Sequence, residues 1–410
     1  MRAQVFYGPG DLRFEDIPVP EPEPGGLVVR VEAALTCGTD VKTLRRGHPV
    51  MIPHVPTVFG HELAGVVTAV GRGAPGVKEG DRIVAANSAP CGRCPLCAAN
   101  RPNLCEDLLF VNGAYGEYIA LPPRLVARNV VGIGPRLAAS SAAFAEPLAC
   151  ALLGVERGRV EAGMTVVIWG HGPLGCLLAL AAGQRGARVV IVGKAGWRLD
   201  RIRELGLGAC VDAPSVPDMV GHLRGLTGGR GPDVTVDATG RPEVWEQAIE
   251  GVGRGGTVIL FGGCVPGTSV RVDTRRAHYE ELTLVGAFHH TPAMIRRAVE
   301  LLESKAIEPA GLLTHRMGLG QVKEALALME RGETMKVLVD SLAMSTRNRR
   351  RMLMVAAAAL AGLALVRPAP DTVALNAGYR FQHISNGHTA HPNRGFNSDS
   401  GTGGVSFYFK

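Results

Sequence analysis

The sequence predicts an α/β protein with two differently built parts, a β-rich first part and a doubly wound parallel sheet. Before about residue 150, short apolar runs are interrupted by proline and glycine, a pattern typical of irregular β structure. From residue 165 onward, short β-branched runs alternate with helical stretches, which indicates a parallel sheet covered on both faces. A chain of 410 residues is also too long for one simple core, so two or three domains are expected.

The first part is expected to contain strands at residues 3–7, 12–16, 27–34, 63–70, 82–86 and 114–121. A short helix is expected after Cys37, with Thr39 or Asp40 near its cap. A second helix, from about residue 138, carries Glu146 and Pro147. A proline inside a helical pattern predicts a kink, and an acid among apolar neighbours needs a partner, so the kink is expected to direct Glu146 toward one.

The second part is expected to contain six strands, the number in a full dinucleotide-binding fold. They are predicted at residues 165–169, 188–192, 209–212, 234–237, 257–261 and 282–286, with helices at 173–185, 198–205, 216–227 and 242–252 between them. The chain then changes character again. Helices at 293–304 and 320–331 and strands at 313–317 and 336–339 are expected to pack back on the first part.

The charge of the chain is concentrated at its end. Of 44 Lys+Arg and 37 Asp+Glu, residues 341–410 hold eight and two, which leaves 36 against 35 for residues 1–340. A nearly neutral main body predicts no nucleic-acid partner. The opening residues read as strand, turn and strand rather than as a signal peptide, so a cytoplasmic location without membrane contact is expected for this body.

Four of the nine cysteines lie within fifteen residues, at Cys91, Cys94, Cys97 and Cys105. This spacing suits a metal better than a disulfide framework, and it fits a reducing compartment. Four thiolates can enclose one zinc tetrahedrally and close a loop that lacks its own core. Spacing alone also allows an iron–sulfur cluster. The favoured interpretation is a structural zinc, because four protein ligands leave no open position for chemistry.

A second group of candidate ligands is dispersed along the chain. His61 and Glu62 follow Gly60, a residue that can turn the backbone sharply. Alone, a His-Glu pair most often lies at the end of a strand without further function. Cys37 upstream and Glu146 downstream change this interpretation, because thiolate, imidazole and carboxylate together are zinc ligands. We therefore expect Cys37, His61 and an acidic residue to hold a catalytic zinc.

A glycine-rich turn follows the first strand of the parallel sheet and opens a helix. Only in that context is Gly-x-Gly-x-x-Gly a specific signal for dinucleotide binding. The glycines let the backbone approach a pyrophosphate, and the helix N-terminus adds partial positive charge. The residues expected to bind the coenzyme here are Gly170, Gly172, Pro173, Leu174 and Gly175.

The second parallel strand ends without the acid that usually binds the adenosine ribose of NAD. Gly193 stands there instead, with Lys194 next and Arg198 nearby. Space and positive charge suit a 2′-phosphate, which favours NADP over NAD. The alternative is that both basic side chains are simply solvated. His289 and His290 begin the last segment and are candidates to face a substrate pocket, although such histidines more often lie in a loop.

Over residues 1–340 the chain resembles the zinc-dependent medium-chain alcohol dehydrogenases, nearest to the sorbitol and threonine dehydrogenase branch. The resemblance rests on the residues around Cys37, Gly60–Glu62, the four-cysteine loop, Glu146-Pro147 and Gly170–Gly175, in family order. It implies a GroES-like catalytic domain and a Rossmann coenzyme domain. The implied divisions are 1–153 and 289–340 for the catalytic domain, 154–288 for the coenzyme domain, and 341–410 for an atypical tail.

The resemblance also implies an activity. Cys37 and His61 would ligate one catalytic zinc, with Glu62 and Glu146 as the remaining carboxylates, bound directly or through water. A secondary alcohol or polyol, or the matching carbonyl, would exchange a hydride with NAD(P). Thr39 matches a hydroxyl that passes the alcohol proton toward solvent, but Lys42 stands where some members have a histidine. The family usually forms dimers or tetramers, so a homo-oligomer is expected.

The tail departs from this family. A 15-residue apolar run, 352–366, follows basic residues and resembles the core of a secretory signal, yet it is internal and short for a membrane span. Beyond it the chain resembles the last strands of an outer-membrane lipid A deacylase, in which His383 and Ser385 would match catalytic residues. Too few residues remain to close a barrel, so an inactive remnant is expected. A lipid A esterase and a zinc-free reductase are the competing functions.

Overall fold

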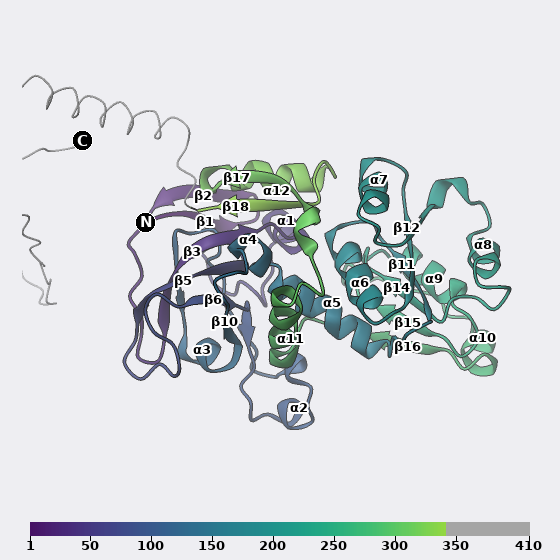
Figure 1. Ribbon diagram of the computed structural model, residues 1–410, viewed down its shortest axis with the longest axis horizontal. Helices are drawn as coiled ribbons and strands as arrows, with labels where there is room; N and C mark the ends of the chain where they lie inside the picture. Colours follow the sequence, from purple (N-terminus) through teal and green to yellow (C-terminus); the bar gives the residue numbers. More distant parts are fainter. Residues whose placement is uncertain (342–410) are drawn as a thin grey trace, which may run out of the picture. The chain divides into compact units, whose positions relative to one another are not determined.

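The first part of the chain folds into a seven-stranded sheet that is mainly antiparallel. The computed structural model of the protein describes residues 1–341. Strands β10, β6, β5, β3, β18 and β17 are neighbours in that order, and β9 also pairs with β3 (Figure 1). Their bounds are β3 (Leu27–Leu35), β5 (Glu62–Val70), β6 (Arg82–Ala85), β9 (Tyr118–Leu121), β10 (Val130–Gly132), β17 (Leu313–Gly318) and β18 (Lys336–Asp340).

Two smaller sheets and three short helices complete this part. The three-stranded sheet has the order β2 (Asp11–Asp16), β1 (Arg2–Gly8) and β4 (Thr57–Val58), and β7 (Ser88–Ala89) pairs with β8 (Leu109–Phe110). The short helices are α2 (Pro95–Ala98), α3 (Pro123–Asn129) and α4 (Ala139–Ala142). Alternate residues of β3, beginning with Leu27 and Val29, are fully buried in the core of this part, as the period of two in a strand requires.

The second part is a six-stranded sheet in which all neighbours are parallel. The strand order is β13 (Ala209–Asp212), β12 (Arg188–Gly193), β11 (Thr165–Trp169), β14 (Val234–Asp237), β15 (Thr257–Leu260) and β16 (Thr283–Gly286). The chain runs outward from β11 to β13 and then restarts at β14 on the other side. In such a doubly wound sheet, ligands bind at the carboxyl ends of the strands where the order reverses.

Helices cover both faces of the parallel sheet, as the continuous apolar strands predict. Val166 and Ile168 of β11 pack in one core with α6, whereas Val167 and Trp169 pack in another with α8 and α9. These and the neighbouring helices are α5 (Ala145–Arg157), α6 (Pro173–Gln184), α7 (Trp197–Glu204), α8 (Met219–Gly225), α9 (Pro242–Gly251), α10 (Thr274–Tyr279), α11 (Pro292–Glu303) and α12 (Val322–Glu330). The predicted combination of a β-rich part and a doubly wound sheet is confirmed.

The last described segment returns to the first part, as expected. Strand β18 pairs antiparallel with β3, with Leu338 opposite Leu35, and β17 pairs parallel with β18. Residues more than 300 positions apart therefore lie in one sheet. The residue numbers at which the catalytic and coenzyme domains divide stay a prediction.

Several local expectations were wrong. Pro147 produces no kink, because α5 begins at Ala145 and the proline lies in its first turn, where no backbone donor is needed. The strand expected at 114–121 is confined to β9, because residues 114–117 turn through Gly113 and Gly116 to reach it. The helix expected at 216–227 is shorter in the structure, where α8 covers only Met219–Gly225. By contrast, Thr39 and Asp40 lie near the cap of helix α1 (Gly38–Arg46) as expected, with Cys37 as the N-cap residue and Asp40 completing the capping box.

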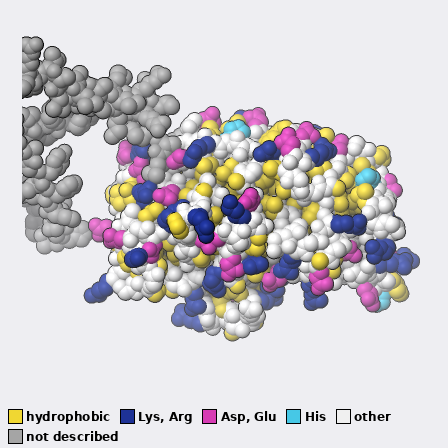
Figure 2. Space-filling view, in the orientation of Figure 1, with side chains coloured by type: hydrophobic (Ala, Val, Ile, Leu, Met, Phe, Trp, Pro, Cys, Tyr) yellow, Lys and Arg dark blue, Asp and Glu magenta, His cyan; other side chains and the backbone are white. Residues whose placement is uncertain are grey.

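The atypical tail, with the signal-like run, His383 and Ser385, lies outside the described residues. Within residues 1–341, no helix is long and apolar enough to cross a membrane. Figure 2 shows acidic and basic side chains intermixed on the visible face of these residues, in agreement with their balanced charge.

One glycine before β5 has two separate reasons to be glycine. Gly60 has φ of 86°, and a Cβ built on it would lie 2.7 Å from the ring of Tyr115. Gly73 has nearly the same backbone, φ of 84°, but a Cβ there meets nothing within 4 Å. Comparing alanine variants at these two glycines therefore separates the free energy lost to positive φ from the free energy lost to the clash with Tyr115.

We therefore expect Gly60→Ala to lower the free energy of unfolding by about 2–4 kcal/mol, because strain at positive φ adds to overpacking. Gly73→Ala, the matched control, should cost about 1 kcal/mol. Urea denaturation followed by circular dichroism measures both. Equal losses in the two variants would contradict the role of the Tyr115 contact.

Candidate functional site

Cys37 lies at the N-terminus of α1, two residues after β3 ends. Its Sγ accepts a hydrogen bond from the backbone N–H of Thr39 at 3.4 Å, and its own N–H donates to Oδ2 of Asp40 at 3.0 Å. This reciprocal arrangement is a capping box, in which a thiol takes the place of the usual hydroxyl. The half-buried Cys37 sulfur is thus fixed at the positive end of a helix.

His61 stands immediately before β5, opposite the end of β3, so strand pairing brings it to the Cys37 segment. Leu35 is the partner of Glu62 in that pairing. Nδ1 of His61 lies 2.9 Å from Oδ1 of Asp40. Asp40 is in turn held by the hydroxyl of Tyr115, which donates to its Oδ2 at 2.5 Å. A carboxylate on one ring nitrogen orients the other toward a metal.

Glu62 is fully buried and its carboxylate contacts Lys336, the first residue of β18. Both carboxylate oxygens accept from Nζ of Lys336, at 2.6 Å for Oε1, and the same Nζ donates to the Thr36 carbonyl at 2.8 Å. Burial alone lowers the pKa of Lys336, but the Glu62 charge outweighs it and raises that pKa. The ammonium is therefore charged. Cys37, His61 and Glu62 nevertheless offer ligand atoms within 4.8 Å of one another.

Glu146 is the other predicted acid, and it comes from the first turn of α5. The Glu146 side chain is 8% exposed, with the Cys150 sulfur 3.7 Å and Nε2 of His290 3.8 Å from its Oε1. Burial raises the pKa of Glu146 to about 7, while the charges of His61 and Lys336 oppose that rise. Among the described residues Glu146 has no hydrogen bond stronger than the one that it accepts from the Cys150 thiol.

His289 joins Glu146 and Cys150 in a second group with ligand atoms within 4.8 Å of one another. Nε2 of His289 lies 2.6 Å from Oγ of Ser88, and Nε2 of His290 lies 2.9 Å from Oδ1 of Asn87. The structure thus brings both histidines to Glu146. Nδ1 of His290 is buried without a hydrogen-bond partner among residues 1–341.

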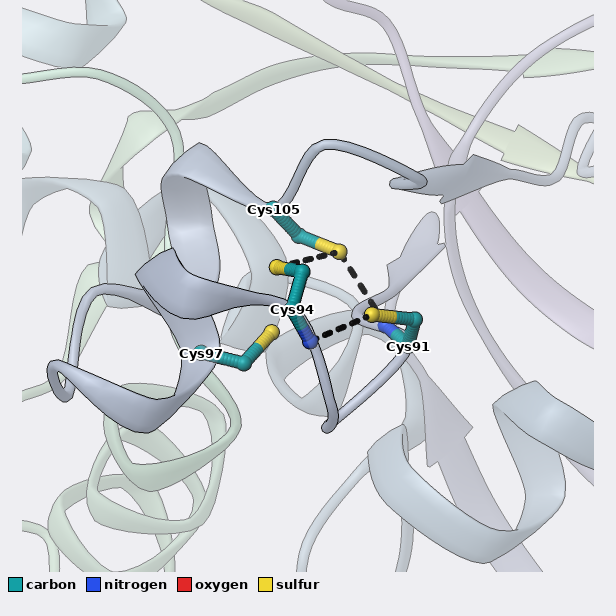
Figure 3. A group of neighbouring side chains, drawn as sticks. All are labelled: Cys91, Cys94, Cys97 and Cys105. Carbon is teal, nitrogen blue, oxygen red and sulfur yellow. Dashed lines mark hydrogen bonds between the residues drawn. The ribbon is translucent and has the colours of Figure 1, made fainter.

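The four-cysteine group is formed as predicted. Figure 3 shows the four side chains converging from the loop that includes α2. Their sulfur atoms lie within 4.8 Å of one another, with Sγ of Cys94 3.9 Å from Sγ of Cys105. Backbone N–H groups of Arg93 and Cys94 donate to Cys91 and lower the pKa of its thiol to about 6. Four converging free thiols with such donors fit one tetrahedral zinc.

The glycine-rich turn joins β11 to α6, as predicted. A Cβ on Gly175 would lie 2.0 Å from the carbonyl oxygen of Gly170, so the turn closes only with glycine there. Gly172 is the N-cap of the 12-residue α6, and Pro173 is its first residue. A helix N-terminus at the carboxyl edge of a parallel sheet is suited to a pyrophosphate.

The residues expected at the ribose end are separated by the structure. Gly193 accommodates the ring of His171, since a Cβ on it would lie 2.5 Å from that imidazole. Lys194 is exposed and makes no hydrogen bond or ion pair within the described chain. Arg198 donates to the Thr334 carbonyl, which reduces its availability to a phosphate.

Three residues of the site were not recognised from the sequence as parts of it. Lys336 and Tyr115 carry no local signal, because each contacts a residue that is distant in the sequence. Asp40 had a usable signal, since an acid three residues after a helix cap is typical of a capping box.

A group of candidate metal ligands and a dinucleotide turn in one chain are the features of a metal-binding dehydrogenase. Residues 23–130 match the alcohol dehydrogenase GroES-like domain, and residues 173–304 match the zinc-binding dehydrogenase family. A D-altritol 5-dehydrogenase of Agrobacterium fabrum is 33% identical over 78% of this chain and 94% of that protein. The chain belongs to the zinc-binding alcohol dehydrogenase family, which confirms the resemblance and the GroES-like and Rossmann folds.

Other relatives agree. A sorbitol dehydrogenase of Bacillus subtilis is 28% identical over 83% of this chain and 97% of that protein. A solved zinc-binding dehydrogenase of Sinorhizobium meliloti, bound to NADP, has a TM-score of 0.76 and 31% identity, covering 83% of this chain and 98% of that one. Residues 343–406 match the lipid A 3-O-deacylase (PagL) family, as the tail suggested, and lie outside the described residues.

The buried Lys336–Glu62 pair generates a prediction about stability. Lys336→Met leaves the Glu62 carboxylate buried without a partner, so the free energy of unfolding should fall by about 3–5 kcal/mol. Lys336→Arg, the matched control, retains the charge and should lose less. Urea denaturation measures both, and the double variant Glu62→Gln, Lys336→Met should recover part of the loss. A Lys336→Met protein as stable as the wild type would exclude this role.

Proposed function

We propose that the chain is a zinc-dependent dehydrogenase that transfers a hydride between a secondary alcohol or polyol and NADP. The observation that carries this proposal is the group of Cys37, His61 and Glu62, whose ligand atoms lie within 4.8 Å of one another, together with Glu146 of a second such group, in a chain with a complete dinucleotide turn. A thiolate, an imidazole and a carboxylate leave a fourth zinc position for substrate or water. Family membership supports zinc and a nicotinamide coenzyme in general.

Of the two candidate acids, we assign the direct ligand role to Glu146. Both oxygens of Glu62 already accept hydrogen bonds from Lys336. Glu146 has only the weak Cys150 contact within residues 1–341, and burial holds its pKa near 7, so binding a cation stabilises its charged form. Glu62 then acts as a positioning residue that fixes the backbone beside His61.

The zinc would act as a Lewis acid that polarises the substrate oxygen and lowers the pKa of its hydroxyl. The residues of the chain prepare the site for this. Asp40 orients His61, and the capping box fixes the Cys37 sulfur at the N-terminus of α1. The Thr39 hydroxyl has no hydrogen bond within the described residues, so it is free to take the alcohol proton and pass it toward solvent. Lys42, three residues further on, is exposed.

The four-cysteine group is assigned a second, structural zinc, because its four thiols leave no position for a substrate. For the coenzyme, Gly193 and the exposed Lys194 support NADP. Gly193 places no acidic side chain at the end of β12, and the Lys194 ammonium can pair with a 2′-phosphate. Arg198 contributes less, because the Thr334 carbonyl already accepts from it.

The remaining proposals concern assembly and location. Strand β16 lies at the edge of the parallel sheet, and Leu284 on it is 39% exposed, which supports pairing with a second copy in a homo-oligomer. The nine cysteines are free thiols, which supports a reducing compartment such as the cytosol.

Zinc content tests the proposed function directly. Purified protein should contain two zincs per chain by elemental analysis and oxidise secondary alcohols or polyols with NADP. His61→Ala should retain one zinc and lose turnover, because the metal loses its imidazole. His54→Ala, an exposed histidine seven residues earlier, is the matched control and should keep both zincs and full activity. A wild-type chain with one zinc or none would overturn the catalytic site.

Coenzyme preference is tested by binding. Lys194→Ala should raise the Kd for NADPH by roughly 10-fold, the value of one charged hydrogen bond, and leave the Kd for NADH unchanged. Lys78→Ala removes an exposed lysine from a loop of the first part and should alter neither constant. Quenching of intrinsic fluorescence measures all four values. Tighter binding of NADH than NADPH by the wild type would overturn the NADP assignment.

A further inference from the structure

His289 occupies an unusual position between the two parts of the chain. It follows β16 and precedes α11, and its φ of 63° is a left-handed conformation that side chains other than glycine rarely adopt. Such strain persists only where the surrounding structure demands it, and it occurs often at functional sites. One imidazole nitrogen lies within 4.8 Å of a Glu146 oxygen and of the Cys150 sulfur.

The surroundings of His289 fix one side of its ring. Oγ of Ser88 is 2.6 Å from Nε2, and the rings of Phe110 and His290 lie 5.3 and 3.9 Å from the imidazole. Asn103, inside the four-cysteine loop, donates to the carbonyl of Phe288 at 3.0 Å. The ring therefore has one defined orientation.

The other side of the ring is unused. Nδ1 of His289 makes no hydrogen bond within residues 1–341, yet it is not sealed in the interior as Nδ1 of His290 is. His289 as a residue is only partly buried. A nitrogen that has no partner, can be reached and is held rigidly beside the proposed zinc ligands is available to a bound molecule.

We propose that His289 is a substrate-binding residue whose free nitrogen hydrogen-bonds a second hydroxyl, on the carbon next to the one that is oxidised. The inference rests on the proposed function and specifies its substrate class. Vicinal diols and polyols carry this second hydroxyl, whereas simple secondary alcohols lack it.

A hydroxyl fits this nitrogen better than an ion does. The contacts that hold His289 come from the Ser88 hydroxyl and the rings of Phe110 and His290, so they add no cationic side chain for an anion to pair with. If Ser88 donates to Nε2, Nδ1 carries the proton and donates; with the opposite tautomer, Nδ1 accepts. A hydroxyl can both donate and accept, so it satisfies either tautomer.

Two substrates that differ by one hydroxyl test the proposal, namely butane-2,3-diol and butan-2-ol. The measured quantity is the ratio of kcat/KM for the diol to kcat/KM for the alcohol, with zinc-loaded full-length protein and one coenzyme. His289→Gly removes the imidazole without backbone strain and should lower this ratio by about 10- to 100-fold, mainly through the KM of the diol. His289→Asn should retain more of it, because asparagine tolerates this backbone and keeps a polar group.

Lys305→Gly is the matched control, since Lys305 also has a left-handed backbone, with φ of 58°, and lies in an exposed loop. Its ratio should equal that of the wild type. Equal losses on both substrates in His289→Gly would show a merely structural role and overturn the proposal. Loss of one zinc from that variant would make His289 a metal ligand and overturn it as well.

Binding separates this inference from the proposed function. Butane-2,3-diol should raise the Tm of the zinc-loaded wild type more than butan-2-ol does, and His289→Gly should remove the difference. If the wild type oxidises neither compound but shows this difference, the dehydrogenase proposal fails and the hydroxyl subsite stands. If the wild type oxidises alcohols but shows no preference for the diol in either assay, the subsite is wrong.

Discussion

The buried ion pair between Glu62 and Lys336 is the interaction on which the rest of the site depends. It joins the first residue of β5 to the first residue of β18, with β3 between them. Neither charge is stable in the interior without the other, so the pair stabilises the return of the last described strand to the first part. Lys336 also binds the Thr36 carbonyl, one residue before Cys37. One contact therefore completes the sheet and fixes the segments that carry both candidate ligands.

The three buried acids of the site differ in their partners. Glu62 balances Lys336, and Asp40 accepts from Tyr115, the Cys37 backbone and His61. Glu146 alone retains a carboxylate without a strong hydrogen bond within the described chain, and burial raises its pKa. The sequence alone could not distinguish the roles of Glu62 and Glu146. They differ because Lys336, 274 residues after Glu62, binds the Glu62 carboxylate.

Patterns that depend on neighbouring residues were predictable, and contacts between distant ones were not. Continuous β-branched runs gave the parallel sheet, and the glycine spacing gave the dinucleotide turn, because both signals are local. The four-cysteine group was equally local. Pro147 was misjudged because a proline in the first turn and a proline inside a helix look alike until the helix start is known. Ser88 and His289 are 201 residues apart, and no pattern joins them.

Long-range contacts also connect the four-cysteine loop to the segment that carries His289. Ser88 precedes this loop, Asn103 lies within it, and Phe110 follows it, and all three contact residues 288 and 289. A loop without its own core keeps one conformation only if something closes it, which is what four thiolates around one zinc can do. A zinc bound by the four thiols would therefore also hold the loop's contacts to His289, the residue that we propose binds substrate.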